Sequence, residues 1–261
     1  MPPDMRKAHP AHGSRGWSVD GCHHGRDVSG EGVRSADFQI ETCEQEVAFA
    51  YTKSYTTALA ALAILSVRIV ERRNLLAKGY SHAELAQVPA LIREALKLEP
   101  QVRELAKRVS PLTRIELFGT GVGWATASEA ALKIKEACYI AAEGFETEEI
   151  LHGPFSETDS RAALIGLLTG RETDNRAKQI LRAAGELKML RAAIAHSSAN
   201  HDISAEQILL VPETPGWLTA FVHLVPLQLL TYFLALERSL NPDTGRQDQP
   251  AHAAASRRYK Y

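Results

Sequence analysis

The middle of the chain carries side chains that can move protons at neutral pH. Glu129, Lys133 and Glu136 follow one another at i, i+4 and i+7, and His152 comes further along, before Gly153-Pro154. A carboxylate that a neighbouring ammonium keeps ionised can act as a general base. A histidine of near-neutral pKa can open a sugar ring or shuttle a proton. These four residues are therefore the candidate catalytic set.

Spacing alone also permits structural roles for the same residues. On a helix the three charged residues lie about 200° from the apolar stripe, which comprises Ala127, Ala131, Ile134 and Cys138. Such a face is commonly solvated and carries a weakly stabilising Glu129–Lys133 pair. A histidine in a last helical turn, followed by Gly-Pro, is likewise a common helix stop that complements the helix dipole. Spacing by itself favours these structural roles.

A glycine-rich turn, Gly119-Thr120-Gly121-Val122-Gly123, precedes the charged helix. Backbone N–H groups of Gly121 and Gly123 could approach a phosphate at the helix N-terminus, or the glycines could serve only a tight turn. The G-x-G-x-G spacing differs from the dinucleotide pattern G-x-G-x-x-G, and no acidic residue is expected to end the next strand. The turn therefore gives little support for NAD binding.

A second candidate anion site is the segment Thr169-Gly170-Arg171-Glu172-Thr173, which joins an apolar strand to a helix. The hydroxyls of Thr169 and Thr173, the guanidinium of Arg171 and free N–H groups could bind a phosphate. The alternative is an ordinary helix start capped by Thr169 or Thr173.

The elements that must position these side chains alternate between short apolar strands and amphipathic helices. That order predicts an α/β fold with a parallel sheet covered on both faces. The expected strands are 114–118, 162–168, 192–196 and 207–211, and the expected helices are 124–140, 145–152, 174–188 and 217–240.

The N-terminal part has a different character. Residues 1–35 are rich in Gly, Pro, His and charge and are expected to form a disordered tail, in which Cys22-His23-His24 is a poor metal site. A strand is expected over 37–43, a helix over 53–78 with Ser54 as its cap and Gly79 as its stop, and one or two helices over 88–109, broken near Pro100.

Bulk composition excludes several classes of protein. The 261 residues carry a formal net charge of -1, which points to neither nucleic acid nor an anionic membrane as a partner. Three scattered cysteines, Cys22, Cys43 and Cys138, fit a reducing compartment. No secretory leader is recognised, and the most apolar stretch, 58–70, is expected to be too short to span a bilayer. We therefore expect a soluble, cytoplasmic protein.

From residue 37 onward the chain resembles the sugar isomerase (SIS) domain family, in particular the isomerase half of glutamine–fructose-6-phosphate aminotransferases. The resemblance is carried by ASEAALKIKEACYIAAEGFETEEILHGP (127–154), TKSYT (52–56), VPLQLL (225–230) with Tyr232, and the tail motifs NPD (241–243) and DQP (248–250). It implies a three-layer αβα sandwich around a five-stranded parallel sheet, and dimers. It also implies that Glu136 moves a proton between C1 and C2, that His152 opens the ring from the neighbouring subunit, and that Glu129 and Lys133 frame the site.

The departures from this family are informative. Pro2 and Pro3 follow Met1 where the family has a cysteine nucleophile, and Ala255 occupies the position of the Schiff-base lysine. The chain is expected to comprise a tail (1–35), a remnant of a first SIS domain with linker helices (36–110) and a complete second SIS domain (111–261). No metal or organic cofactor is implied. The two hypotheses are a homodimeric sugar-phosphate isomerase or deaminase, and a phosphosugar-binding protein without turnover.

Overall fold

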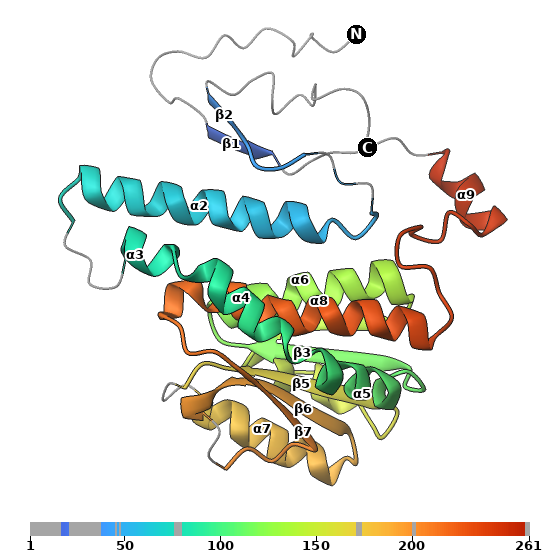
Figure 1. The fold of residues 1–261 in the computed structure, drawn as a ribbon. Helices are drawn as coiled ribbons and strands as arrows, with labels where there is room; N and C mark the ends of the chain where they lie inside the picture. Colours follow the sequence, from blue (N-terminus) through green and yellow to red (C-terminus); the bar gives the residue numbers. More distant parts are fainter. Residues whose placement is uncertain are drawn as a thin grey trace, which may run out of the picture.

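The computed structural model describes residues 17–20, 38–44, 46, 48–75, 80–170, 174–199 and 202–258. Its centre is a parallel sheet of five strands in the order β4-β3-β5-β6-β7 (Figure 1). The strands are β3 (Arg114–Gly119), β4 (Ala141–Glu146), β5 (Ala162–Leu168), β6 (Leu190–His196) and β7 (Gln207–Val211). The four predicted strands are confirmed, and β4 is an addition.

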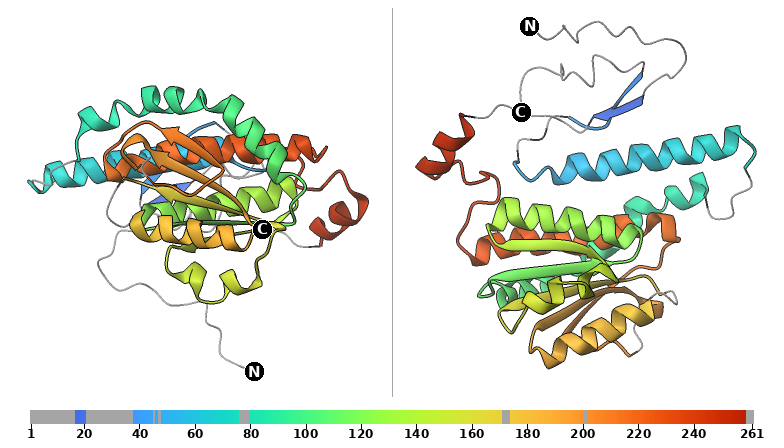
Figure 2. Two further views of the ribbon diagram at one scale, coloured as in Figure 1. Left: turned by 90° about the horizontal axis from the view of Figure 1, so that it is seen from below. Right: turned by 180° about the vertical axis from the view of Figure 1, so that it is seen from behind.

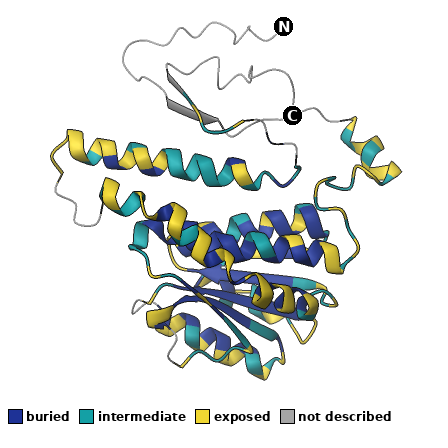
Figure 3. Ribbon diagram, viewed as in Figure 1, coloured by how far each residue is buried: buried dark blue, intermediate teal, exposed yellow. Residues whose placement is uncertain are grey.

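Two helical layers cover this sheet. On one face lie α5 (Glu99–Val109), α6 (Val122–Cys138) and α8 (Thr219–Glu237), and on the other lies α7 (Asp174–Glu186) (Figures 1 and 2). Successive residues of β5 alternate between the two cores, since Ala163, Ile165 and Leu167 pack on the first layer whereas Leu164 and Leu168 pack on the second. The predicted αβα sandwich is therefore confirmed, and the buried residues concentrate in the sheet and in α6 and α8 (Figure 3).

The helix predicted over 145–152 is wrong. Residues Ala141–Glu146 form β4, which pairs in parallel with β3, and two short 3₁₀ turns follow, η1 (Glu149–Leu151) and η2 (Pro154–Glu157). A Cβ on Gly144 would lie 2.4 Å from Ser128 N, so the glycine permits β4 and α6 to pack backbone to backbone. The edge position of β4 leaves it only partly buried, so it lacks the continuous apolar run that is typical of a buried parallel strand.

The N-terminal elements lie beyond α6 and α8. The strands β1 (Trp17–Asp20) and β2 (Phe38–Glu41) form a two-stranded parallel sheet. Residues 17–20 therefore form a strand within the segment 1–35, where no regular structure was expected. The helices α2 (Thr52–Arg72), α3 (His82–Leu85) and α4 (Val88–Leu96) follow. The break near Pro100 is confirmed, because α5 begins at Glu99. Cys22-His23-His24 and Gly79 lie outside the described residues.

Two helices have the length and apolar composition of a membrane span, contrary to the expectation from 58–70. For the helical segment 216–237, 83% of the apolar window is buried inside the molecule, as in a core helix. For α2 the corresponding share is 11%, and its Leu62 and Ile69 are exposed. Length and composition are weak evidence for a membrane span. The low buried share of its window identifies α2 as a largely uncovered apolar helix.

Candidate functional site

The three charged residues of α6 form one connected cluster. Lys133 Nζ donates to Glu136 Oε2 at 2.9 Å and lies 3.6 Å from Glu129 Oε1. The side chains of Lys133, Glu129 and Glu136 are only 10%, 14% and 25% exposed. The solvated helix face that spacing favoured is therefore wrong. The cluster is a partly desolvated arrangement of one ammonium between two carboxylates.

The electrostatics of this cluster differ from those of a surface salt bridge. Burial raises the pKa of Glu129; the ammonium of Lys133 partly offsets this rise, and the charge of Glu136 adds to it. Burial also raises the pKa of Tyr55 on α2, and the Glu129 carboxylate adds to that rise. Tyr55 therefore stands near Glu129, which brings the N-terminal part of α2 to the α6 cluster. Spacing along α6 could not reveal this neighbour.

The N-terminus of α2 is fixed by Glu46 rather than by Ser54, the predicted cap. The buried Glu46 carboxylate accepts hydrogen bonds from Lys53 N at 3.0 Å and from Ser54 N and Ser54 Oγ, both at 2.8 Å. Burial opposes its ionisation, but these hydrogen bonds hold the pKa of Glu46 below its usual value. Gln228 of α8 also donates to Thr52 O at 3.3 Å. The segment 52–56 is thereby attached to α8.

His152 is exposed and follows η1, so the predicted role as the stop of a longer helix is wrong. The backbone N–H of His152 donates to the carbonyl oxygen of Glu149 at 3.0 Å, and Gly153 follows with φ +120°. A three-residue 3₁₀ turn has little dipole for a histidine to complement. The imidazole therefore stands at the surface without a helix-capping function.

The glycine-rich turn serves the packing of β3 and α6. Gly121 adopts φ +58°, a conformation that favours glycine, and a Cβ on Gly119 would lie 2.8 Å from Gly123 C. Gly123 N donates to Thr120 O, and Trp124 N donates to Gly121 O, so the turn itself uses donors that a phosphate would need. Glu146 does end the next strand, contrary to expectation. The glycine spacing still departs from the dinucleotide pattern.

The second predicted anion site is described only in part, because Arg171 and Thr173 lie outside the described residues. Thr169 is half-buried after β5. Gly170 N donates to the buried Asp174 carboxylate at 2.5 Å. In the described part of this turn, the Asp174 carboxylate therefore already accepts from an N–H group that a phosphate would need.

The candidate residues fall into two groups at opposite ends of the sheet. Parallel strands direct their carboxyl ends to one edge, where the turns containing Gly121 and Thr169 lie, as does the segment after β4 that leads to His152. Helix α6 runs back from that edge, so Glu136 in its last turn lies at the opposite end. Within a single chain, His152 and the acid/base residues of α6 therefore do not share one end of the sheet.

Two remaining expectations concern the tail and metals. Ala255 lies exposed in α9 (Pro250–Ser256), away from the core clusters. Within the described ranges, no group of three or more His, Cys, Asp or Glu residues could hold a metal ion.

Comparison with known proteins gives consistent matches. A family model of the SIS domain matches residues 110–238. The chain is 33% identical over 226 residues to the glutamine–fructose-6-phosphate aminotransferase (isomerizing) of Thermococcus kodakarensis, covering 84% of this chain and 37% of that protein. It is 31% identical over 209 residues to the enzyme of the same name from Neisseria meningitidis, covering 77% and 34%. The chain thus spans about a third of the length of these relatives.

Solved structures show the same fold. The C-terminal domain of glucosamine-fructose-6-phosphate aminotransferase from Francisella tularensis matches with a TM-score of 0.77 and 26% identity, covering 83% of this chain and 63% of that one. Tagatose-6-phosphate ketose/aldose isomerase from Escherichia coli matches with a TM-score of 0.60 and 21% identity, covering 76% and 53%. The second likeness concerns the fold alone.

Proposed function

This chain belongs to the SIS domain family, and on that premise we propose that it binds a hexose 6-phosphate and moves a proton between C1 and C2 of the sugar. The reaction would be an aldose–ketose isomerisation or the deamination of an amino-sugar phosphate. The observation that carries the proposal is the partly buried arrangement of Lys133 between Glu129 and Glu136.

In this proposal Glu136 is the base that removes and returns the proton. The Lys133 ammonium donates to the Glu136 carboxylate at 2.9 Å and thereby fixes the position of the base. Glu129 holds the other side of the ammonium and thereby orients it. The substrate carbonyl accepts the electron pair of the broken C–H bond and becomes an enediolate oxygen, and return of the proton to the neighbouring carbon completes the isomerisation without an external oxidant. In the deamination, the same proton transfer gives an imine at C2, which a water molecule hydrolyses to the ketone and ammonia.

We propose further that the working unit is a homodimer. Glu136 and His152 lie at opposite ends of the sheet, so a site containing both requires two chains. Helix α2 borders the Glu129 cluster and carries exposed apolar residues, with Leu62 at 48% and Ile69 at 47% exposed. Their burial against another chain would be favourable. We place this dimer in the cytoplasm, as expected for a metabolic enzyme.

The second candidate function is phosphosugar binding without turnover. Ala255 stands where the family resemblance implies a Schiff-base lysine. In the predicted phosphate-binding turn, the Asp174 carboxylate already accepts a hydrogen bond from Gly170 N. Neither observation affects the Glu136 cluster. The two functions therefore differ in one measurable step, which is proton exchange on the bound sugar.

The test is proton NMR of fructose 6-phosphate and glucosamine 6-phosphate incubated with the protein in D2O. Wild type is compared with Glu136→Gln and with Glu104→Gln, a control in an exposed pair with Lys107 on α5. Deuterium at C1 or C2 with wild type and Glu104→Gln, but not with Glu136→Gln, supports the isomerase. Binding of sugar phosphate without exchange favours the second function. Exchange that persists in Glu136→Gln excludes this residue as the base.

A further inference from the structure

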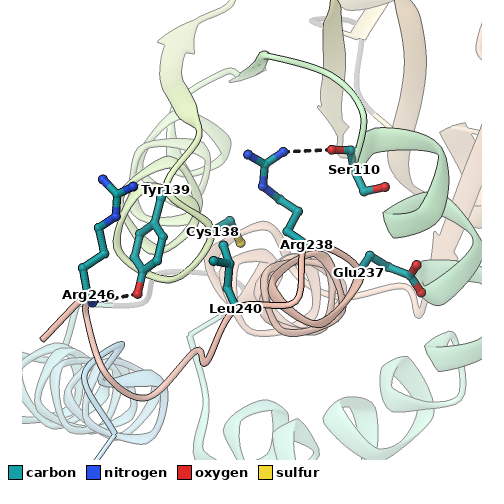
Figure 4. Close-up of a pocket in the computed structure, with 7 residues that line it drawn as sticks. All are labelled: Ser110, Cys138, Tyr139, Glu237, Arg238, Leu240 and Arg246. Atoms are coloured by element: carbon teal, nitrogen blue, oxygen red, sulfur yellow. Dashed lines mark hydrogen bonds between the residues drawn. The ribbon is translucent and has the colours of Figure 1, made fainter. Parts of the chain in front are cut away.

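A cavity of about 360 Å³ lies where the C-terminal ends of α5, α6 and α8 meet (Figure 4). Ser110 from the end of α5, Cys138 and Tyr139 from the end of α6, and Arg238 from the end of α8 line it. Arg246 reaches it from the loop after α8. None of the proposed acid/base residues is among its lining residues, so it is a separate site.

Two arginines dominate this cavity. Arg238 Nη1 donates to Ser110 O at 2.8 Å, and the Arg246 guanidinium lies over the Tyr139 ring, with Cζ 4.4 Å from its centroid. The Nε atoms of both arginines are buried and have no hydrogen-bond partner in the part of the chain that the structure describes. A guanidinium stays charged at all physiological pH values, and buried donors without acceptors are costly.

The surrounding groups do not neutralise these two charges. Across the described ranges, neither Arg238 nor Arg246 makes a salt bridge with a carboxylate. Glu237 also lines the cavity, but its carboxylate points away from the two guanidinium groups in Figure 4. The three helix C-termini contribute partial negative charge, and the Ser110 carbonyl takes up one donor of Arg238. Both Nε donors remain unused.

We propose that this cavity binds a small phosphate-bearing anion between Arg238 and Arg246. Guanidinium groups bind phosphate oxygens through paired, charge-assisted hydrogen bonds, and a phosphate dianion can accept from both arginines at once. The cavity volume is within the range of small-molecule sites. The Tyr139 ring and the Cys138 thiol offer a weakly polar wall for the organic part of a phosphate ester. This inference does not depend on the proposed isomerase function.

Isothermal titration calorimetry with inorganic phosphate and with glycerol 3-phosphate, an ester that is not a hexose phosphate, tests the site. We expect Arg246→Gln to weaken binding about 10- to 100-fold, as expected for loss of a charged hydrogen-bond donor. Arg257→Gln, a change of an exposed arginine after α9, and Glu136→Gln should each change the affinity less than about twofold. Tighter binding of the ester than of inorganic phosphate would identify the ester as the ligand, and equal affinities would show recognition of the phosphate group alone.

Several results would overturn the proposal. These are no binding of either probe to wild type, equal binding by Arg246→Gln and wild type, or a loss in Glu136→Gln as large as in Arg246→Gln. Arg238 donates to Ser110 O at the end of α5, whereas the Arg246 guanidinium lies over the Tyr139 ring, so Arg246→Gln is the variant expected to keep the fold. Circular dichroism of each variant confirms this, and Arg246→Lys, which retains the charge, should recover part of the affinity. The outcome is independent of proton exchange at the Glu136 site.

Discussion

Lys133 donates to Glu136 at 2.9 Å across one turn of α6, and both side chains are largely removed from solvent. A surface pair with the same spacing exists on α5, where Lys107 Nζ lies 3.4 Å from Glu104 Oε2 and both side chains are more than half exposed. The chain therefore contains its own control for the effect of burial on an i, i+3 ion pair.

Removing Lys133 should be costly, because it leaves two partly buried carboxylates facing each other. We expect Lys133→Met to lower the free energy of unfolding at pH 7 by about 1–3 kcal/mol, and Lys107→Met to change it by less than about 0.5 kcal/mol. Chemical denaturation of both variants measures the difference. Equal losses would show that burial does not distinguish the two pairs.

The loss in Lys133→Met should also depend on pH. A carboxyl whose folded-state pKa is raised binds more protons in the folded state, so it destabilises the protein above that pKa and ceases to do so on acidification. The pKa of Glu129 is already raised above 4.5 in wild type and should rise further without Lys133. The difference between wild type and Lys133→Met should therefore shrink as the pH falls from 7 towards 4.5. A constant difference over this range would contradict the account.

The proposed two-chain site predicts complementation between inactive variants. Glu136→Gln and His152→Ala should each be inactive alone, but a mixed dimer has one site with an intact Glu136 from one chain and an intact His152 from the other. Random mixing through unfolding and refolding should restore about a quarter of wild-type proton exchange. Mixing either variant with itself is the control. Absence of recovery in confirmed mixed dimers would show that the two residues do not share a site across chains.

Two glycines predict opposite effects of an added methyl group. In Gly144→Ala the new Cβ would lie 2.4 Å from Ser128 N on α6, and the backbone cannot yield easily, so we expect a loss of about 1–3 kcal/mol. In Gly123→Ala the Cβ would lie 3.7 Å from Leu167 Cβ, an ordinary contact, and a helical alanine should add about 0.5–1 kcal/mol. Thermal unfolding of both variants measures these changes in stability. An unchanged stability of Gly144→Ala would show that the β4–α6 contact can accommodate a methyl group.

The Cys138 thiol should be unreactive in the folded protein. Burial raises its pKa to about 12, although Arg238 acts in the opposite direction, and its Sγ donates to Thr231 O at 3.2 Å. At pH 8 only about one thiol in ten thousand would be ionised. Peptide mass spectrometry after iodoacetamide treatment should find Cys138 modified only in denaturant, and half-buried Cys43 modified earlier. Rapid native labelling of Cys138 would show that the end of α6 opens readily.

Much of the fold follows from patterns within the sequence. The strands 162–168 and 207–211 have the predicted ends. The first is an apolar run buried along its whole length, and the second is a short apolar run at the edge of the sheet. Strand β4 was missed because it lies at the edge, and its glutamates resemble those of a helix. The cap of α2 was missed because Glu46 comes from a preceding loop, which local capping rules do not include.

The candidate site was predictable in its residues but not in its arrangement. Spacing placed Glu129, Lys133 and Glu136 on one face, yet their burial depends on α2 and α8, which pack there from elsewhere in the sequence. The separation of Glu136 from His152 could have been inferred from the direction of α6, since a helix that leaves the carboxyl edge ends near the opposite one. No sequence pattern links Arg238 to Arg246 as a possible anion site, because only the meeting of three helix ends in the folded chain brings them together.

The position of Glu136 and His152 at opposite ends of the sheet has a consequence for how activity responds to the amount of protein. If each site draws its base and its histidine from different chains, dilution dissociates the site itself. Specific activity should then fall with dilution and reach half its maximum near the dissociation constant of the dimer. Expression level would then set the turnover per chain as well as the number of chains, so that a modest drop in abundance would lower the total proposed activity more than proportionally.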